Sequence, residues 1–267
     1  MTPSTGDPLG RPDHGRTGAD YGPMAEFYEL VAERQAAVSG PLVTEALAGL
    51  GDIDPAEGPI VEIGAGTGAI TEVIADAVPD AAIVAAEPSA GMRAVIRSRL
   101  VDRPVLLPRV TVTNGAAPDL DLPDRLTAAV ILGVAGHLDP EARIRLWSRL
   151  RARLAEGGVI VVELMGTRSA RPLPPSRQLR ATIGSHSYEW WVAGEPAGPE
   201  TMRFTTRWLV GGADGTRRRE VVSSHIWHHV DPGGLATESG MAVRPLGPPT
   251  GSGLPVAVVL THPEEAP

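Results

Sequence analysis

The sequence has no cysteine and no lysine, because all 24 of its basic residues are arginine. Without cysteine the chain cannot use a thiolate nucleophile, a thiolate zinc site or a disulfide. Without lysine it cannot form a Schiff base, complete a P-loop or supply the Tyr-x-x-x-Lys pair of some reductases. Arginine without lysine, beside abundant alanine, glycine and proline, is typical of a bacterium with a high-GC genome.

Excess positive charge and long apolar runs are also missing. The net charge is −8 and the pI is about 5.4, which argues against a nucleic-acid partner because phosphate binding depends on basic surface. No run of 18 apolar residues and no basic-then-apolar leader occurs, so we expect a cytoplasmic protein that does not enter a membrane. At 267 residues and 42% hydrophobic content, one α/β domain with an elaboration can form, and small molecules are the expected substrates.

The segment 59–71, PIVEIGAGTGAIT, organises the rest of the chain. Its apolar run is rich in β-branched residues and suits a strand buried on both faces. Alternate glycines then free the backbone for a tight turn that a ligand can approach closely: Gly64, Gly66 and Gly68. Helix-forming sequence follows, so we predict a strand, a glycine turn and a helix whose first amides can hold a polar ligand.

Two cofactors could use this loop. Gly64, Gly66 and Ala69 satisfy the dinucleotide fingerprint G-x-G-x-x-G/A, with Glu87 as the acid further on. The same loop reads E-x-G-x-G-x-G from Glu62, which resembles the first motif of class I S-adenosylmethionine (SAM)-dependent methyltransferases. Charge favours the methyl donor, because Glu62 can orient a cationic ammonium where a dinucleotide would place its anionic pyrophosphate. Two alternatives stay open: a SAM-binding protein that promotes cyclisation or rearrangement without methylating, and a nicotinamide-dependent oxidoreductase.

The resemblance implies an α/β fold with a seven-stranded, doubly wound Rossmann-like sheet and helices on both faces. The strands that we expect cover residues 60–63, 82–87, 110–114, 127–132, 159–164, 242–245 and 255–261. Two helices separated at residues 39–41 should precede the first strand. Further helices are expected at 69–78, from 88 onward, at 140–154 with a glycine stop at 157–158, and at 232–239.

The chain divides into five expected parts. They are a disordered leader (1–20), an N-terminal helical cap (21–58), a SAM-binding core (59–165), an inserted antiparallel ribbon (166–230), and the final helix and strands of the core (231–267). We predict three ribbon strands, with turns at 195–198 and 211–215. This ribbon could cover the substrate or form the contact of a homodimer.

The resemblance also implies a set of SAM-binding residues. Glu62 would orient the methionine ammonium, and Glu87, at the end of the second strand, would accept hydrogen bonds from the ribose hydroxyls. Ala116 stands where many relatives have an acid that binds adenine, so another group must recognise that base. The other expected contacts are Gly64, Ala65, Gly66, Gly68, Pro88, Met92, Gly115 and Gly133.

Candidates for catalysis and substrate binding follow from strand ends and alternation. His137 follows the fourth strand, in the loop toward which the resemblance implies that the methyl group points, so it is the first candidate for a general base or a substrate contact. The alternative is a structural loop histidine bonded to the backbone. His186 and Tyr188 are the next candidates. Tyr21 and Arg34 could also contact SAM or substrate, and the residues expected to line the acceptor pocket are Tyr28, Trp190, Trp208, His225 and Trp227.

Two further groups of residues are interpreted as structural. His225, His228 and His229 lie close in sequence, but neighbouring strand residues face opposite ways and no carboxylate lies at ligand spacing, so we expect no metal. The arginines of the 140–154 helix are interpreted as a solvated face: Arg143, Arg145, Arg149, Arg151 and Arg153. The sequence therefore predicts a methyltransferase that acts on a small molecule, for which we expect a bacterial secondary metabolite.

Overall fold

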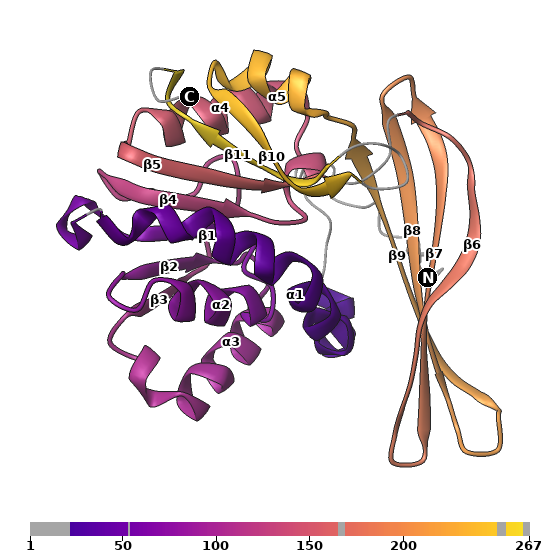
Figure 1. The fold of residues 1–267 in the computed structure, drawn as a ribbon. Helices are drawn as coiled ribbons and strands as arrows, with labels where there is room; N and C mark the ends of the chain where they lie inside the picture. The colour runs from indigo at the N-terminus through magenta and orange to yellow at the C-terminus, as the bar shows by residue number, and fades with distance from the viewer. Residues whose placement is uncertain (1–21, 53, 165–168, 250–254, 264–267) are drawn as a thin grey trace, which may run out of the picture.

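Short β-branched segments form the centre of a seven-stranded sheet with the order β10–β11–β5–β4–β1–β2–β3 (Figure 1). The computed structural model describes residues 22–52, 54–164, 169–249 and 255–263, so the predicted leader and Tyr21 lie outside the described residues. Strands β1 to β5 run parallel, and β11 and β10 are added antiparallel at one edge. The predicted sheet is confirmed, with strands β1 (Ile60–Ile63), β2 (Ile83–Ala86), β3 (Val110–Thr113), β4 (Leu126–Ile131), β5 (Leu154–Glu163), β10 (Ala242–Pro249) and β11 (Pro255–Thr261).

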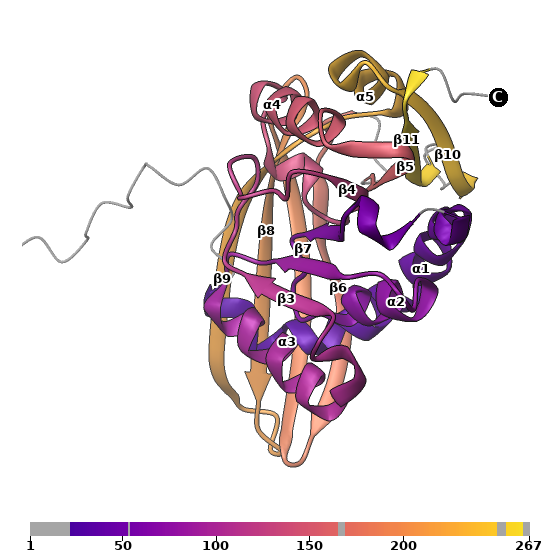
Figure 2. The same cartoon turned by 90° about the vertical axis from the view of Figure 1, so that its left-hand side faces the viewer.

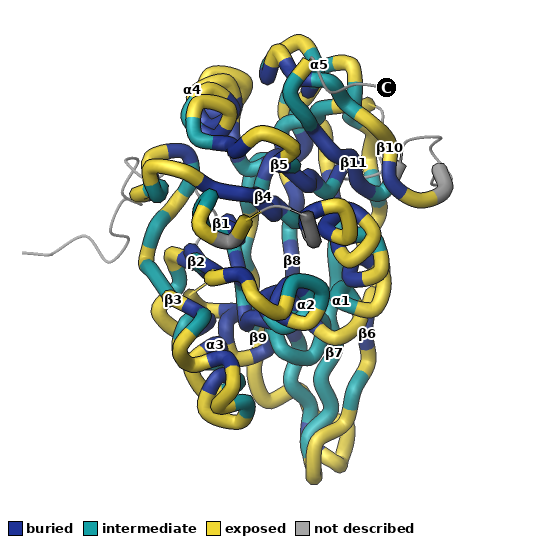
Figure 3. Tube along the Cα trace, turned by 60° about the vertical axis from the view of Figure 1, so that its left-hand side comes forward, coloured by how far each residue is buried: buried dark blue, intermediate teal, exposed yellow. Residues whose placement is uncertain are grey.

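Helices cover both faces of this sheet, because successive strand residues point to opposite sides. Ile60 packs in the apolar cluster beneath α1 (Ala25–Leu47), α2 (Ala69–Ala77) and α3 (Ala90–Asp102). Its neighbour Val61 packs in the opposite cluster, beneath α4 (Pro140–Arg151) and α5 (Pro232–Ser239). Figure 3 shows the buried positions concentrated along the central strands. Short 3-10 turns complete the core at Gly22–Met24 (η1), Ala48–Asp52 (η2), Pro55–Glu57 (η3), Pro104–Leu106 (η4) and Ala135–His137 (η5).

The prediction of two helices before the first strand was wrong. Helix α1 continues through Pro41. Proline in a helix removes one hydrogen bond, but tertiary packing holds this segment in place, since Ser39 and Val43 on either side of Pro41 are buried. None of the helices in the described ranges is long and apolar enough to cross a membrane.

The expected glycine stop of the 140–154 helix was also wrong. Helix α4 ends at Arg151, and Leu154 already pairs with Leu126 in the sheet. Between Leu154 and Val159 the register of the β4–β5 pair shifts, and Gly157 adopts a φ of +71° there. The glycines therefore make an irregularity inside β5 and do not end the helix.

Four strands, not three, form the ribbon: β6 (Leu173–Ile183), β7 (His186–Gly198), β8 (Thr201–Gly211) and β9 (Arg217–His228). Strand β6 escaped prediction because it contains Pro174 and Pro175 and is mostly exposed, which removes the alternating pattern. As an edge strand it can tolerate proline, which donates no ladder hydrogen bond. The predicted turn at 195–198 lies within β7, whereas the predicted turn at 211–215 overlaps the β8–β9 hairpin.

The ribbon stands beside the core, at the edge where the parallel strands end (Figure 1), and in Figure 2 it lies behind the core and extends below it. Aromatic side chains join the two parts. The ring of Phe27 in α1 stacks on Trp208 at 5.1 Å between centroids, and Trp208 stacks on Trp190 at 5.9 Å. The inner face of the ribbon thus closes over the start of α1.

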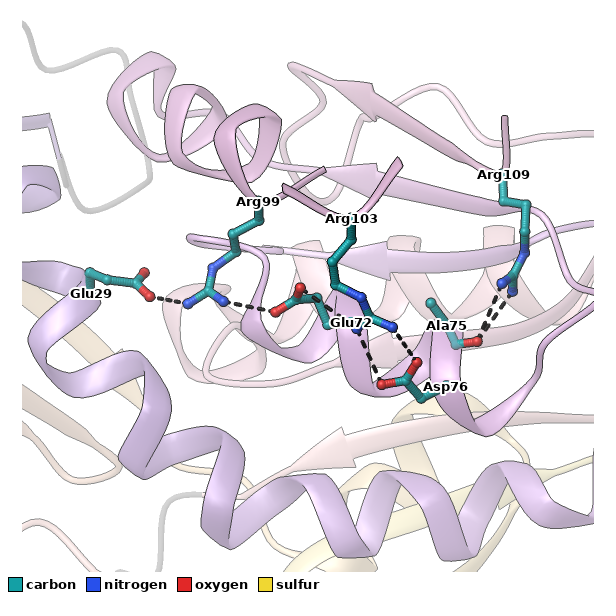
Figure 4. Close-up of polar contacts among 7 residues, drawn as sticks. All are labelled: Glu29, Glu72, Ala75, Asp76, Arg99, Arg103 and Arg109. Atoms are coloured by element: carbon teal, nitrogen blue, oxygen red, sulfur yellow. Dashed lines mark hydrogen bonds and ion pairs between the residues drawn. The ribbon is translucent and has the colours of Figure 1, made fainter. Parts of the chain in front are cut away.

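Ion pairs connect the three helices α1, α2 and α3, which cover one face of the sheet (Figure 4). Arg99 of α3 forms ion pairs with Glu29 of α1 and with Glu72 of α2, the latter at 2.8 Å. Arg103 adds a contact of 2.7 Å to Asp76. These partly exposed pairs contribute about 0–1 kcal/mol each, and the Arg99–Glu29 pair attaches to α3 the turn of α1 that carries Tyr28.

The interpretation of the α4 arginines as a solvated face was wrong for two of them. Arg143 is 2% exposed and donates Nε and Nη2 to the two carboxylate oxygens of Glu238, at 2.8 and 2.6 Å. Its Nη1 donates to the Leu138 carbonyl at 2.8 Å. Arg149 donates to the carbonyls of Pro118 and Leu120. Both guanidinium groups bind carbonyl groups of loops outside α4. The helical spacing of the arginines does not predict such contacts.

Candidate active site

Two adjoining cavities lie where the parallel strands end. The first, here called the glycine-loop cavity, has a volume of about 130 Å³ and is bordered by the loops after β1, β2 and β4. The second, here called the ribbon cavity, measures about 590 Å³ and lies between α1, the loop after β4 and the inner face of the ribbon. Tyr28 and Gly133 line both cavities.

The glycine loop needs its glycines at the points where the backbone turns. Gly64 has a φ of +77°, and a Cβ atom there would lie 2.4 Å from the Val134 Cγ2 atom. Any other residue would therefore strain the backbone and collide with the loop after β4. This close approach of two loops leaves the Gly66 amide turned toward the end of β2.

Glu87, which follows β2, is held by that amide. Its Oε2 accepts from the Gly66 N–H at 3.0 Å, and its Oε1 accepts from the Ser89 N–H at 2.7 Å. Burial raises the pKa of Glu87, while these two amide hydrogen bonds oppose the shift. Each carboxylate oxygen keeps a second acceptor site beside the glycine-loop cavity, which suits a vicinal pair of hydroxyl groups.

Glu62, at the other side of the glycine turn, borders a smaller recess of about 50 Å³ together with Ala65 and Tyr28. Its Oε2 accepts from the Thr71 hydroxyl at 2.5 Å. Burial raises the pKa of Glu62 to about 8, so the carboxyl group is mostly protonated at neutral pH. A cation in the recess would reverse that shift.

The remaining residues of the expected SAM set are distributed around these spaces. Gly68 lines none of them and instead supplies the left-handed N-cap of α2, with a φ of +88°. Ala116 lies in the wall of the glycine-loop cavity and offers no side-chain acceptor there. The same wall contains Pro88, Met92, Gly115 and Gly133.

His137 lines the glycine-loop cavity, within η5. Its ring lies 4.7 Å from that of His225 and 5.0 Å from Trp227, measured between centroids. Burial, reinforced by His225, lowers the pKa of His137 to about 3. The imidazole is therefore neutral at pH 7 and a weak proton acceptor, unlike a base tuned to neutral pH.

Aromatic rings form much of the ribbon cavity. Trp190, Trp208, His225 and Trp227 of the ribbon line it, and Tyr28 of α1 lines it from the other side. The other two base candidates lie elsewhere in the ribbon and line neither cavity. His186 pairs with Ile183 at the β6–β7 hairpin, and Tyr188 packs 6.3 Å from Phe27.

Glu163 is the functional candidate that the sequence analysis missed. It ends β5 and lines the ribbon cavity, where its Oε1 accepts from the Ser39 hydroxyl at 2.6 Å and its Oε2 from Gln35 Nε2 at 3.4 Å. Burial raises the pKa of Glu163, and hydrogen bonds from Ser39, Gln35 and the Gly133 amide oppose the shift. The sequence contains a signal for this residue, because β5 ends in an acid just as the segments at Glu62 and Glu87 do.

Comparisons with known proteins agree with this geometry. A family model described as a methyltransferase domain matches residues 60–158. The structure of DesVI from Streptomyces venezuelae is 18% identical with a TM-score of 0.68, over 90% of this chain and 98% of that chain. SAM-bound CalS10, an amino pentose methyltransferase from Micromonospora echinaspora, is 20% identical with a TM-score of 0.65, over 88% and 96%. Residues 60–158 therefore match a methyltransferase domain, and the chain as a whole has the fold of SAM-dependent methyltransferases.

A further similar structure is the glycopeptide N-methyltransferase MtfA with S-adenosylhomocysteine (SAH), at 26% identity and a TM-score of 0.51, over 77% of this chain and 82% of that chain. The comparison with curated proteins gave no match. As a methyltransferase the protein uses SAM as its cofactor, which sets the nicotinamide alternative aside.

The residues of this methyltransferase fit the chemistry of SAM. Glu62 is a buried carboxyl group without an ion pair among the described residues, and a ligand ammonium would supply the missing cation. The Glu87 carboxylate suits a ribose diol. Within the described ranges, no group of three or more His, Asp or Glu side chains is arranged to hold a metal ion.

Proposed function

We propose that this methyltransferase methylates an amine of a small natural-product intermediate that binds in the ribbon cavity. The observation that carries the proposal is the junction of the two cavities at Tyr28 and Gly133. Bound SAM supplies an electrophilic methyl group on a sulfonium. An acceptor in the ribbon cavity can reach it through this junction.

The residues of the glycine-loop side hold the cofactor. Glu62 binds the methionine ammonium and Glu87 binds the ribose hydroxyls, so the cofactor spans the glycine turn. Tyr28 borders all three spaces, and burial together with the charges of Glu87 and Glu163 raises its pKa to about 12. Its phenol therefore stays protonated and can donate a hydrogen bond at the junction.

The ribbon side determines the acceptor. A cavity of about 590 Å³ with three tryptophans suits a ring-containing metabolite, because such walls bury apolar surface and exclude water. Similar structures include an amino pentose methyltransferase, a sugar N-methyltransferase and a glycopeptide N-methyltransferase. Alignment of acceptor and methyl group supplies much of the rate in such a displacement.

The acceptor side is tested with amino sugars and amine-bearing glycopeptides as substrates, with SAH release and product mass as readouts. Trp190→Ala should reduce turnover at least tenfold while SAM affinity stays within about twofold, since Trp190 lines only the ribbon cavity. Trp191→Ala is the matched control, because the next residue of the same strand points to the outer face beside Arg177. Equal losses in both variants would contradict the placement of the acceptor. Substrate conversion without SAH release would instead support the cyclisation alternative.

The cofactor side is tested by calorimetry. Glu87→Ala should weaken SAM binding by about 1.5–3 kcal/mol, the scale of hydrogen bonds to a charged acceptor. Unchanged SAM affinity in a folded Glu87→Ala protein would remove Glu87 from the ribose site.

A further inference from the structure

Glu163 places a carboxyl group in the ribbon cavity, close to its junction with the glycine-loop cavity. The side chain reaches the cavity from the end of β5, beside Gly133. Three donors of α1 and the β4 loop contact it: the Ser39 hydroxyl, the Gln35 amide and the Gly133 N–H. All three are neutral, so they orient the carboxyl group without balancing a negative charge.

No ion pair with Glu163 occurs in the part of the chain that the structure describes. Arg34 lines the same cavity but donates its Nη1 to the Gln178 carbonyl at 3.2 Å. Among the described residues of the wall, the other side chain that could carry a positive charge is His225; burial lowers its pKa to about 4, so it is neutral at pH 7. The described part of the cavity thus contains a carboxyl group whose ionised form has no protein cation to stabilise it.

The aromatic walls favour the same kind of ligand. Trp190 and Trp208 stack in the cavity wall, and Phe204 lies 5.9 Å from His225 in the same wall. Faces of aromatic rings attract cations, and the attraction is stronger where water is excluded. A carboxylate among such rings is the usual chemistry for binding an ammonium group.

We propose that Glu163 binds the protonated amine of the acceptor and takes its proton before methyl transfer. This inference rests on the proposed function and assigns the residue that performs it. An N–H bond of the ammonium breaks and an O–H bond forms on Glu163, which frees the nitrogen lone pair. The nitrogen then forms a bond to the methyl carbon as the carbon–sulfur bond of the sulfonium breaks, and the product leaves as a methylated ammonium. Buried surroundings raise the pKa of Glu163, which brings it closer to that of an amine and eases the proton transfer.

Binding of a cationic probe tests this assignment without turnover. Benzylamine, which is protonated at pH 7, and benzyl alcohol are titrated against the SAH-loaded enzyme, with quenching of the cavity tryptophans as the signal. Wild type should bind benzylamine at least about tenfold more tightly than the alcohol. Glu163→Gln keeps the shape and the hydrogen-bonding capacity of the side chain, and should bring the two affinities within about twofold of each other.

Glu195→Gln is the control, because it removes the same charge from the ribbon at a side chain that is 70% exposed and pairs with Arg203 outside the cavity. It should keep the wild-type preference. Equal affinities in wild type, a preference that survives in Glu163→Gln, or no binding of either probe would each overturn the role of Glu163. If the amine preference holds but no amine substrate releases SAH, the proposed function fails while the binding site stands. If amines are methylated and Glu163→Gln changes neither preference nor turnover, only the role of Glu163 fails.

Discussion

Binding of SAH should remove a proton from Glu62, and its affinity should therefore depend on pH. Burial raises the pKa of this carboxyl group to about 8 in the free protein. The ligand ammonium needs the ionised form, so binding must first deprotonate Glu62. With a pKa of about 8, Glu62 is ionised in about 0.3% of the free protein at pH 5.5 and in about a quarter of it at pH 7.5.

The dissociation constant of SAH should consequently fall by roughly 20- to 100-fold between pH 5.5 and 7.5, or about 2–3 kcal/mol. Calorimetry at pH 7 in two buffers of different ionisation enthalpy should detect about 0.9 proton released per SAH bound, because about nine tenths of Glu62 is protonated there. Glu62→Gln should bind SAH weakly. Its affinity for SAH should depend little on pH, and no proton should be released from this site. A flat wild-type profile, or the same slope in Glu62→Gln, would refute the assignment of Glu62 to the ammonium.

The stability of the free protein gives an independent measurement of the same group. The folded-state pKa of about 8 lies above the ordinary glutamate value of 4.5. Glu62 therefore stabilises the fold fully below pH 4.5, and this contribution is lost as the pH rises through 8. The melting temperature of wild type should accordingly fall relative to that of Glu62→Gln between pH 5 and 9. Saturating SAH should reduce this difference in melting temperature, since the SAH ammonium compensates the buried negative charge of Glu62.

Three further predictions follow from particular contacts. Arg143→Met should cost about 3–5 kcal/mol in urea unfolding because it leaves the Glu238 carboxylate without its buried partner; a loss under 1 kcal/mol would contradict this. His137→Gln should lower turnover by less than about 100-fold and leave the pH profile unmoved, since a pKa of about 3 keeps the ring neutral; a limb near pH 6.5 that disappears in the variant would restore it as the base. Gly136→Ala should destabilise the protein by about 1–3 kcal/mol and raise the KM for the acceptor, because a Cβ there would lie 1.9 Å from Trp227; near wild-type values for both would show that the ring moves freely.

The sequence alone determined the core and the cofactor. The order of elements from β1 to α3 follows from local patterns: β-branched runs, glycines at the turn, and Ser89, whose hydroxyl accepts from the Met92 N–H at the start of α3. Parallel strands end at the same edge of a sheet, so the sequence alone places the acids at the ends of two such strands together. That is why spacing alone predicts that Glu62 and Glu87 lie near each other, beside the glycine loop.

Only the tertiary structure decided the acceptor side. Glu163 joins Trp190 in one cavity, yet they come from different sheets, and Ser39 and Gln35 reach that carboxyl group from a helix more than a hundred residues earlier. Helical spacing likewise predicts that Arg143 faces solvent, whereas the fold buries it beside Glu238. Local periodicity says which face of an element is apolar, but it carries no information on which distant element covers that face. The proposed donor site depends on short-range backbone geometry, whereas the proposed acceptor site depends on long-range packing.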